Sequence, residues 1–277
     1  MPVPGLGTYS DENREQWVEN VRTALDVGYR HVDTAQGYDN EQYVGEGIAT
    51  SSVDRDAVFL ASKVDPENLA REDLIESTTA SLHRLGTDYL DLLYVHWPTH
   101  TYDAEETLGA LSKLHDEGTI EHIGLSNFTP ELLEEAREIL DVPITAHQVE
   151  CHPLLQQDRL REDAREHDHW LVAYSPLAQG EVFEDPTIRE IAEKHGVSPA
   201  AVSLAWLDAK EHVVPIPKAS SREHLAANLE AFDSPSTTKT SPRSTPSIAS
   251  TGSSIRISPP GTSSAKTPRL LSGRLPA

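Results

Sequence analysis

Four side chains suited to proton transfer stand at the ends of three successive predicted strands. Asp33 and Tyr38 lie at or just after one strand, and Lys63 and His96 end the next two. A tyrosine phenol, with an ordinary pKa of about 10, is a weak acid at neutral pH, but a nearby ammonium lowers that pKa. A carboxylate would hold the ammonium charged and in place, and an imidazole would orient the reacting oxygen. The set therefore predicts a proton donor for a carbonyl that is being reduced.

Each of these residues also has an ordinary structural explanation. Asp33 could cap a helix or pair with a buried cation, and Tyr38 could be an aromatic at the rim of a cleft. Lys63 could end a strand in solvent, and His96 could be a hydrogen-bonded core histidine. Taken singly, the structural explanations are favoured, because isolated motif matches mislead. Taken together at one end of one sheet, the four favour a functional site.

The elements that must position these residues alternate regularly along the chain. Apolar runs predict strands, and apolar residues at helical spacing predict helices. The predicted strands are 5–8, 29–35, 57–63, 89–96, 120–127, 144–150, 170–176 and 213–219. The predicted helices are 12–28, 40–50, 71–86, 104–118, 130–140, 157–168, 188–196, 198–211 and 221–232. These β–α units predict an α/β protein, a parallel eight-stranded (β/α)8 TIM barrel, for which about 250 residues are typical.

A doubly wound sheet is the rival fold, but its G-x-G-x-x-G fingerprint is absent, since GLGTYS (residues 5–10) has only two of the three glycines. In a closed barrel, catalytic groups stand at the C-terminal ends of the strands. Further polar residues at those ends are Ser126, Asn127, Gln148, Tyr174, Ser175 and Lys218. The barrel therefore places polar groups from most of its strands at one rim.

Several segments resemble the aldo-keto reductase family. GYRHVDTAQGYDNE (28–41) is similar to a signature of that family, and further similar segments follow in the family's order. They are LYVHWP (93–98), GLSNF (124–128), HQVECHP (147–153), AYSPLAQG (173–180) and IPKASSREHLAANL (216–229). The resemblance covers about residues 2–232 and is nearest to the microbial 2,5-diketo-D-gluconate reductase-like branch.

The resemblance implies an NAD(P)H-dependent reductase of aldehydes or ketones, with hydride coming from C4 of a nicotinamide. Tyr38 would be the general acid, Lys63 and Asp33 would tune it, and His96 would orient the carbonyl. Tyr9 and Trp97 would line the substrate pocket. The implied cofactor contacts are Thr8, Ser126, Asn127, Gln148, Tyr174, Ser175, Pro176, Leu177, Gln179, Lys218, Ser220, His224 and Asn228.

Three departures from the family pattern bear on function. His224 stands where the family usually has an arginine that grips the 2′-phosphate, although Arg222 is near. A neutral histidine holds a phosphate less well than a bidentate arginine, so NADPH is the expected cofactor and NADH is possible. The hairpin that usually covers the bottom of the barrel is missing, which predicts uncovered apolar residues there. The family's C-terminal loop and final helix are replaced after residue 232.

Composition restricts the partners. The net charge of −22 opposes binding to nucleic acid and favours adaptation to high salt over an ordinary acidic protein. No apolar run is long enough to span a membrane. The start MPVPGLGTYS lacks the features of a secretion signal, and Cys151 is the only cysteine, so a reducing cytoplasm is expected. A small carbonyl compound is the expected partner, and a monomer is the family-like expectation.

The charge also divides the chain into two parts. Residues 1–233 carry all the acidic residues and form the predicted barrel domain. Residues 234–277 are rich in Ser, Thr and Pro, contain no acidic residue and show no periodic apolar pattern, which predicts disorder. A shift of reading frame near Asp233 would produce such a tail, and we favour it over a natural linker.

Two other function classes compete with the reductase. A cofactor-binding redox or regulatory protein with little turnover would fit the altered C-terminus, since fold does not fix function. A metal-dependent hydrolase would use His31 and Asp33, which face the same side of a strand. Further candidate ligands would be His96, His122, His147 and His152. Lys63 at the rim would repel a cation, so no metal site is expected.

Overall fold

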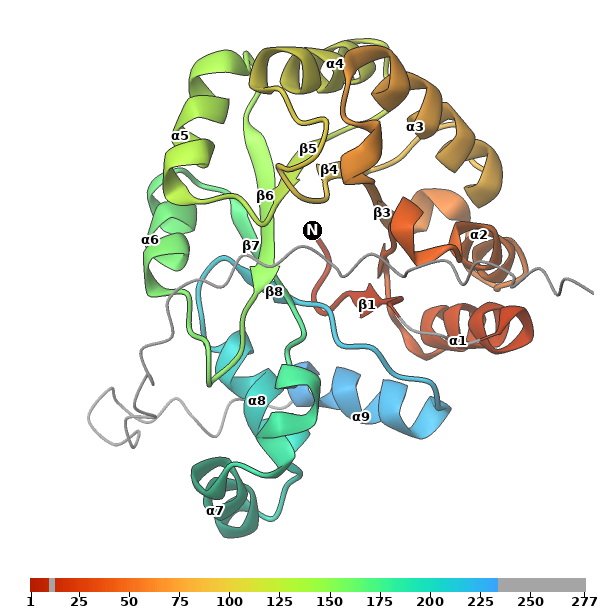
Figure 1. Ribbon diagram of the computed structural model, residues 1–277. Helices are drawn as coiled ribbons and strands as arrows, with labels where there is room; N and C mark the ends of the chain where they lie inside the picture. The colour runs from red at the N-terminus through yellow and green to blue at the C-terminus, as the bar shows by residue number, and fades with distance from the viewer. Residues whose placement is uncertain (10–12, 234–277) are drawn as a thin grey trace, which may run out of the picture.

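The computed structural model describes residues 1–9 and 13–233 (Figure 1). The predicted tail, 234–277, lies outside the described residues, and the division of the chain at residue 233 stays a prediction. No helix in the described ranges is long and apolar enough to cross a membrane.

Eight parallel strands form one curled sheet in the order β1 to β8. They are β1 (Leu6–Gly7), β2 (His31–Asp33), β3 (Phe59–Val64), β4 (Leu92–Val95), β5 (Ile123–Ser126), β6 (Ile144–Glu150), β7 (Trp170–Tyr174) and β8 (Val213–Pro215). The first strand also bonds to the last. The Gly5 N–H donates to the Pro215 carbonyl at 3.0 Å, and the Gly7 N–H donates to the Pro217 carbonyl at 3.2 Å. These bonds close the ring and confirm the predicted (β/α)8 fold.

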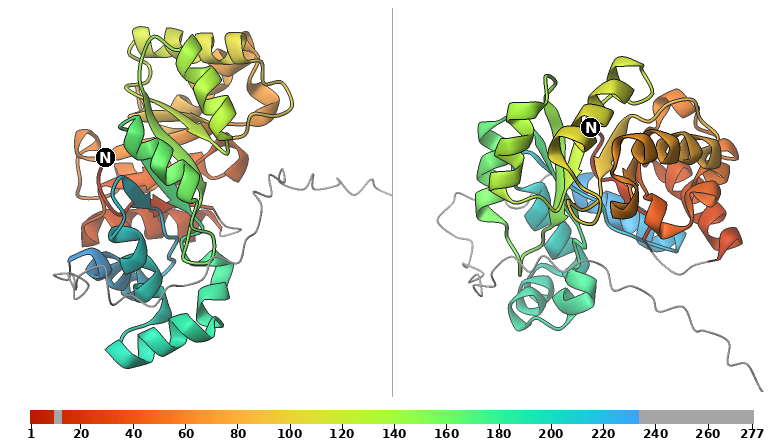
Figure 2. Two further views of the ribbon diagram at one scale, coloured as in Figure 1. Left: turned by 90° about the vertical axis from the view of Figure 1, so that its left-hand side faces the viewer. Right: turned by 45° about the horizontal axis from the view of Figure 1, so that its top comes forward.

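Helices cover the outside of this ring, as the views in Figure 1 and Figure 2 show. They are α1 (Arg14–Val27), α2 (Glu41–Ala49), α3 (Arg71–Leu85), α4 (Ala104–Asp116), α5 (Pro130–Ile139), α6 (Asp158–Glu166), α7 (Pro186–His195), α8 (Pro199–Asp208) and α9 (Arg222–Asp233). Several start where the sequence provides both a cap and a proline. Thr129 accepts from the Leu132 N–H ahead of Pro130, and Ser198 accepts from the Ala201 N–H ahead of Pro199.

The described residues contain four short 3-10 helices that were not predicted from the sequence. They are η1 (Gln36–Tyr38), η2 (Arg55–Ala57), η3 (Pro66–Asn68) and η4 (Ala178–Phe183). Each is too short to show the apolar periodicity on which the predictions depended. Three of them follow the C-terminal ends of β2, β3 and β7, so the barrel's functional end is built largely from such turns.

Two apolar layers hold the barrel together. One lies between strands and helices and includes Trp17, Leu60 and Leu125. The other fills the ring itself around Tyr94 and Val172, as is usual for a barrel of eight strands. Met1 packs against this inner layer. The prediction of an uncovered barrel bottom is therefore corrected in part, because the first residues of the chain enter that end (Figure 1).

Candidate active site

The ammonium of Lys63 contacts two other predicted site residues, Asp33 and Tyr38, and the backbone of Thr34. Lys63 Nζ donates to Asp33 Oδ1 in a close ion pair, to the Thr34 carbonyl at 2.9 Å and to the Tyr38 hydroxyl at 3.3 Å. The side chains of Lys63 and Asp33 are 1% and 2% exposed, so this pair is removed from water. Because a lysine ammonium has three protons, these bonds use its whole donor capacity.

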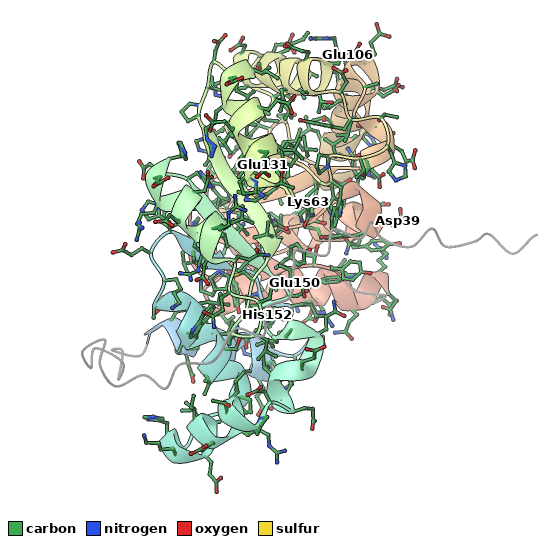
Figure 3. The ribbon with its side chains drawn as sticks, turned by 60° about the vertical axis from the view of Figure 1, so that its left-hand side comes forward. Asp39, Lys63, Glu106, Glu131, Glu150 and His152 are labelled. Atoms are coloured by element: carbon green, nitrogen blue, oxygen red, sulfur yellow. The ribbon has the colours of Figure 1, made fainter. Side chains whose placement is uncertain are left out.

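The ends of the neighbouring strands β2, β3 and β4 bring residues together that are distant in the sequence. Asp33 ends β2 and Lys63 lies near the end of β3, while the 3-10 helix η1 turns Tyr38 back over both. His96 follows β4 directly, and its ring lies edge-on to the Tyr38 ring with centroids 5.7 Å apart. Lys63 lies well inside the molecule among the strands (Figure 3). The structure thus brings the four predicted residues together.

The protonation states follow from burial. Burial raises the pKa of Tyr38 above its ordinary value, and the Lys63 charge offsets only part of that rise. The lowering of the Tyr38 pKa by the ammonium was predicted from the sequence, whereas the larger effect of burial was not. Burial also lowers the pKa of Lys63, but Asp33 and Tyr38 more than offset this, so the net shift is upward. At neutral pH Tyr38 is therefore protonated and Lys63 is charged.

His96 is neutral under the same conditions. Burial, with a smaller contribution from Lys63, lowers the pKa of His96 to about 3. A neutral imidazole has one N–H donor and one acceptor nitrogen. It can therefore donate a hydrogen bond to a carbonyl oxygen without adding a second positive charge beside Lys63.

An amide network adjoins the tetrad on the side of β5 to β7. Gln148 Nε2 donates to Asp33 Oδ2 at 2.7 Å, so Asp33 is held from both sides. Asn127 Nδ2 donates to the His96 carbonyl and to Ser126 Oγ, and its Oδ1 accepts from the Tyr174 hydroxyl at 3.1 Å. This network fixes the floor on which a planar ring could lie.

A cavity of about 490 Å³ opens above this floor. Its lining includes predicted residues from most strand ends: Thr8, Tyr9, Asp33, Tyr38, His96, Trp97, Ser126, Asn127, Gln148, Tyr174, Ser175, Pro176, Gln179 and Lys218. Lys63 lies beneath it. The lining also includes residues that the sequence argument missed: Gly7, Gly37, Asp65, Pro66, Glu67, His100 and Ile216. The volume is in the range of small-molecule sites.

Four predicted cofactor contacts do not line this cavity. Leu177 packs with the small apolar cluster around Val182, and Asn228 is a buried residue of α9. The Ser220 carbonyl accepts a weak bond from Gln16 Nε2 at 3.4 Å. His224 is exposed in the first turn of α9, where its N–H donates to Ser221 Oγ. Their roles toward a cofactor stay predictions.

Backbone strain is concentrated at the same rim. Asn127, Ser175, Ala178 and Gln179 have positive φ angles of 63°, 47°, 49° and 51°. Such conformations are costly for residues other than glycine and cluster where function requires a particular chain path. Three of these residues, Ser175, Ala178 and Gln179, lie in the turn after β7.

A second cavity lies elsewhere and contains none of the four tetrad residues. It has a volume of about 270 Å³, and its lining includes Arg137, Ile144 and His169. Ile144 and His169 stand at the N-terminal ends of β6 and β7, at the end of the barrel opposite the tetrad, and Arg137 belongs to α5. Within the residues that the structure describes, no group of three or more His, Cys, Asp or Glu side chains could hold a metal ion.

Comparison with known proteins decides the family. Residues 5–243 match the Aldo/keto reductase family. The chain belongs to the aldo/keto reductase family. It is 40% identical over 236 residues to methylglyoxal reductase DkgB of Salmonella typhi, covering 84% of this chain and 88% of the relative. The resemblance inferred from the sequence segments is thereby confirmed.

Solved structures agree with this membership. A putative 2,5-diketo-D-gluconic acid reductase B superimposes with a TM-score of 0.81 at 39% identity, covering 84% of this chain and 83% of that one. An aldo/keto reductase from Klebsiella pneumoniae, in complex with NADP and acetate, gives 0.78 at 33% identity, covering 84% and 86%. The protein is accordingly an oxidoreductase of a family that reduces aldehydes and ketones with nicotinamide cofactors.

Proposed function

We propose that this aldo/keto reductase reduces small aldehydes and dicarbonyls with NADPH, using Tyr38 as the general acid. The observation that carries the proposal is the contact of Lys63 Nζ with both Asp33 and the Tyr38 hydroxyl. It couples a proton donor to a buried positive charge at the floor of the cavity. The Salmonella typhi relative is a methylglyoxal reductase by name, which supports the substrate class.

Tyr38 would donate its hydroxyl proton to the carbonyl oxygen as that oxygen gains negative charge. Lys63 stabilises the phenolate that remains, because its ammonium lies 3.3 Å from the phenol oxygen. Asp33 keeps the ammonium in place and compensates its charge. When bound, the nicotinamide supplies the hydride to the carbonyl carbon.

His96 would orient the substrate. Its pKa of about 3 leaves it neutral, so its N–H can donate to the carbonyl oxygen at any pH near neutrality. Its ring lies edge-on to the Tyr38 ring, and both residues line the cavity, so both donors would be offered to one carbonyl oxygen. Two donors aimed at the position where charge develops stabilise the transition state more than the ground state.

The chain's own residues fit a nicotinamide cofactor. Gln148 lines the cavity and uses its Nε2 on Asp33, so its Oε1 would be the acceptor for a carboxamide. Ser126 and Asn127 would add hydrogen bonds, and Tyr174 would stack on the ring. The strained turn at Ser175 to Gln179 would follow the pyrophosphate.

The adenosine end would lie toward Lys218 and the first turn of α9. A helix N-terminus favours negative charge because its N–H groups are free to bind anions. Lys218 supports NADPH, whereas His224 in place of an arginine weakens the preference over NADH. We expect a monomer.

The test is reduction of methylglyoxal by the purified protein, followed as loss of NADPH absorbance, with NADH in parallel. Turnover with a larger kcat/KM for NADPH is expected. The rival function, a redox or regulatory protein, predicts tight NADPH binding without turnover of any carbonyl tried. That result would contradict the proposal.

A further inference from the structure

Two carboxylates stand at the mouth of the active-site cavity. Asp65 follows β3 directly, and Glu67 lies in the 3-10 helix η3 that comes after it. Both line the cavity together with Asp33, Tyr38 and His96. Asp65 caps η3, and neither carboxylate takes part in the chemistry proposed above.

Asp65 is held close to the reacting group. Its Oδ1 accepts from the Glu67 N–H at 3.2 Å, and its own N–H donates to Gln36 Oε1 at 3.0 Å. A Cβ placed on Gly37 would lie 2.9 Å from Asp65 Oδ2. The carboxylate is therefore fixed beside Gly37, the residue that precedes Tyr38, and both Gly37 and Asp65 line the cavity.

Positive charge does not balance this side of the cavity. Among the described residues that line it, Lys218 is the only lysine or arginine, and it follows β8 on the side proposed for the cofactor. The Lys63 charge is compensated by Asp33. His100 Nδ1 lies 2.9 Å from Glu67 Oε1, but a histidine adds charge only when it is protonated.

We propose that Asp65 and Glu67 make this enzyme select uncharged carbonyl compounds against those that carry a carboxylate. Like charges placed together oppose binding and suppress the wrong partner. The inference rests on the proposed function and refines its substrate class. It separates two possibilities that the relatives' names leave open, a neutral dicarbonyl such as methylglyoxal and an acid such as a diketogluconate.

The effect should be moderate for each side chain. Two unit charges about 8 Å apart, at an effective dielectric constant of about 40, change an affinity by about sixfold. Glu67 is 66% exposed, so water and salt screen it more than Asp65. Asp65 is therefore expected to contribute the larger share.

The experiment compares two aldehydes that differ in charge, 4-nitrobenzaldehyde and 4-carboxybenzaldehyde. The measured quantity is kcat/KM for the neutral aldehyde divided by kcat/KM for the acid, at about 0.05 M KCl. Asp65→Asn keeps an acceptor oxygen for the Glu67 N–H, and Glu67→Gln keeps the length of the side chain. Glu106→Gln, in the first turn of α4 and far from Lys63 (Figure 3), removes one equal charge elsewhere.

The ratio in the wild type should favour the neutral aldehyde. This ratio should fall by about sixfold in Asp65→Asn and by less in Glu67→Gln, because KM for the acid becomes lower. It should stay constant in Glu106→Gln. Raising KCl to about 1 M should reduce the wild-type ratio, because the screening length falls to about 3 Å, and should change the double variant little.

Active variants with the wild-type ratio, or a ratio that does not respond to salt in the wild type, would overturn the inference. Absence of turnover of both aldehydes by the folded wild type would instead contradict the proposed function. The two failures are therefore distinguishable.

Discussion

Replacement of Lys63 by methionine tests the buried charge pair most sharply. Methionine keeps the length of the side chain but removes the bonds to Asp33, the Thr34 carbonyl and the Tyr38 hydroxyl. Asp33 would then be a buried carboxylate with Gln148 Nε2 as its remaining side-chain donor. Breaking such a pair by removing one partner costs about 3–5 kcal/mol of unfolding free energy.

For a barrel of this size we expect the melting temperature of Lys63→Met to fall by roughly 6–20 °C. The double variant Lys63→Met with Asp33→Asn should recover part of that loss, because no unpaired charge is left buried. Activity should fall in both by about a hundredfold or more, since the phenolate of Tyr38 loses its stabilising charge. Urea unfolding and steady-state kinetics with methylglyoxal measure the two effects.

A wild-type melting temperature in Lys63→Met would refute the claim that the pair is buried and coupled. So would a double variant whose loss of stability equals the sum of the two single losses. Asp33→Asn alone provides the third corner of the cycle and removes the carboxylate while keeping the shape.

Three further outcomes follow from burial and packing. Because the pKa of Tyr38 is raised, the rate of carbonyl reduction should stay constant through neutral pH and fall only at alkaline pH, where alcohol oxidation should become faster. An inflection of the rate near pH 6.5 would contradict a neutral His96. Stability should fall as pH drops below about 6.5, since several buried histidines have pKa values lowered to about 3 or 4 and bind protons more readily when unfolded. These are His31, His96, His147 and His169. Thermal melts across pH 4–8 measure this, and a flat profile would contradict it. Gly124→Ala should cost about 1–3 kcal/mol, because its Cβ would lie 2.4 Å from the Tyr94 ring. Gly109→Ala meets only the flexible end of a side chain and is the matched control, so equal melting temperatures would refute the packing argument.

Much of the fold could be predicted because its helices and strands carry clear apolar periodicity. Helix α3 was predicted at 71–86 and lies at Arg71–Leu85, and β6 was predicted at 144–150, which are its bounds in the structure. Strand β8 was predicted too long, at 213–219 against Val213–Pro215, because Pro217 has no N–H to donate to a further bond of the ladder.

The site was predicted less completely for two physical reasons. Asp65 and Glu67 lie in a turn too short to have a pattern, although the rule that polar groups after strands form the site could have found Asp65. The bond from Gln148 to Asp33 joins residues that are 115 positions apart, and no local feature of the sequence indicates it. The direction of the Tyr38 pKa shift depends on burial, which only the folded chain determines.

The central claim is that Tyr38 donates the proton. The most direct measurement is kcat/KM for methylglyoxal in Tyr38→Phe beside the wild type, with the NADPH dissociation constant measured on both. Phenylalanine keeps the ring that packs against Tyr9 and His96 and removes only the hydroxyl. The account predicts a loss of about 10²–10⁴ in rate, with the dissociation constant within about twofold. A variant that keeps near wild-type turnover, or that loses binding and rate equally, would contradict it.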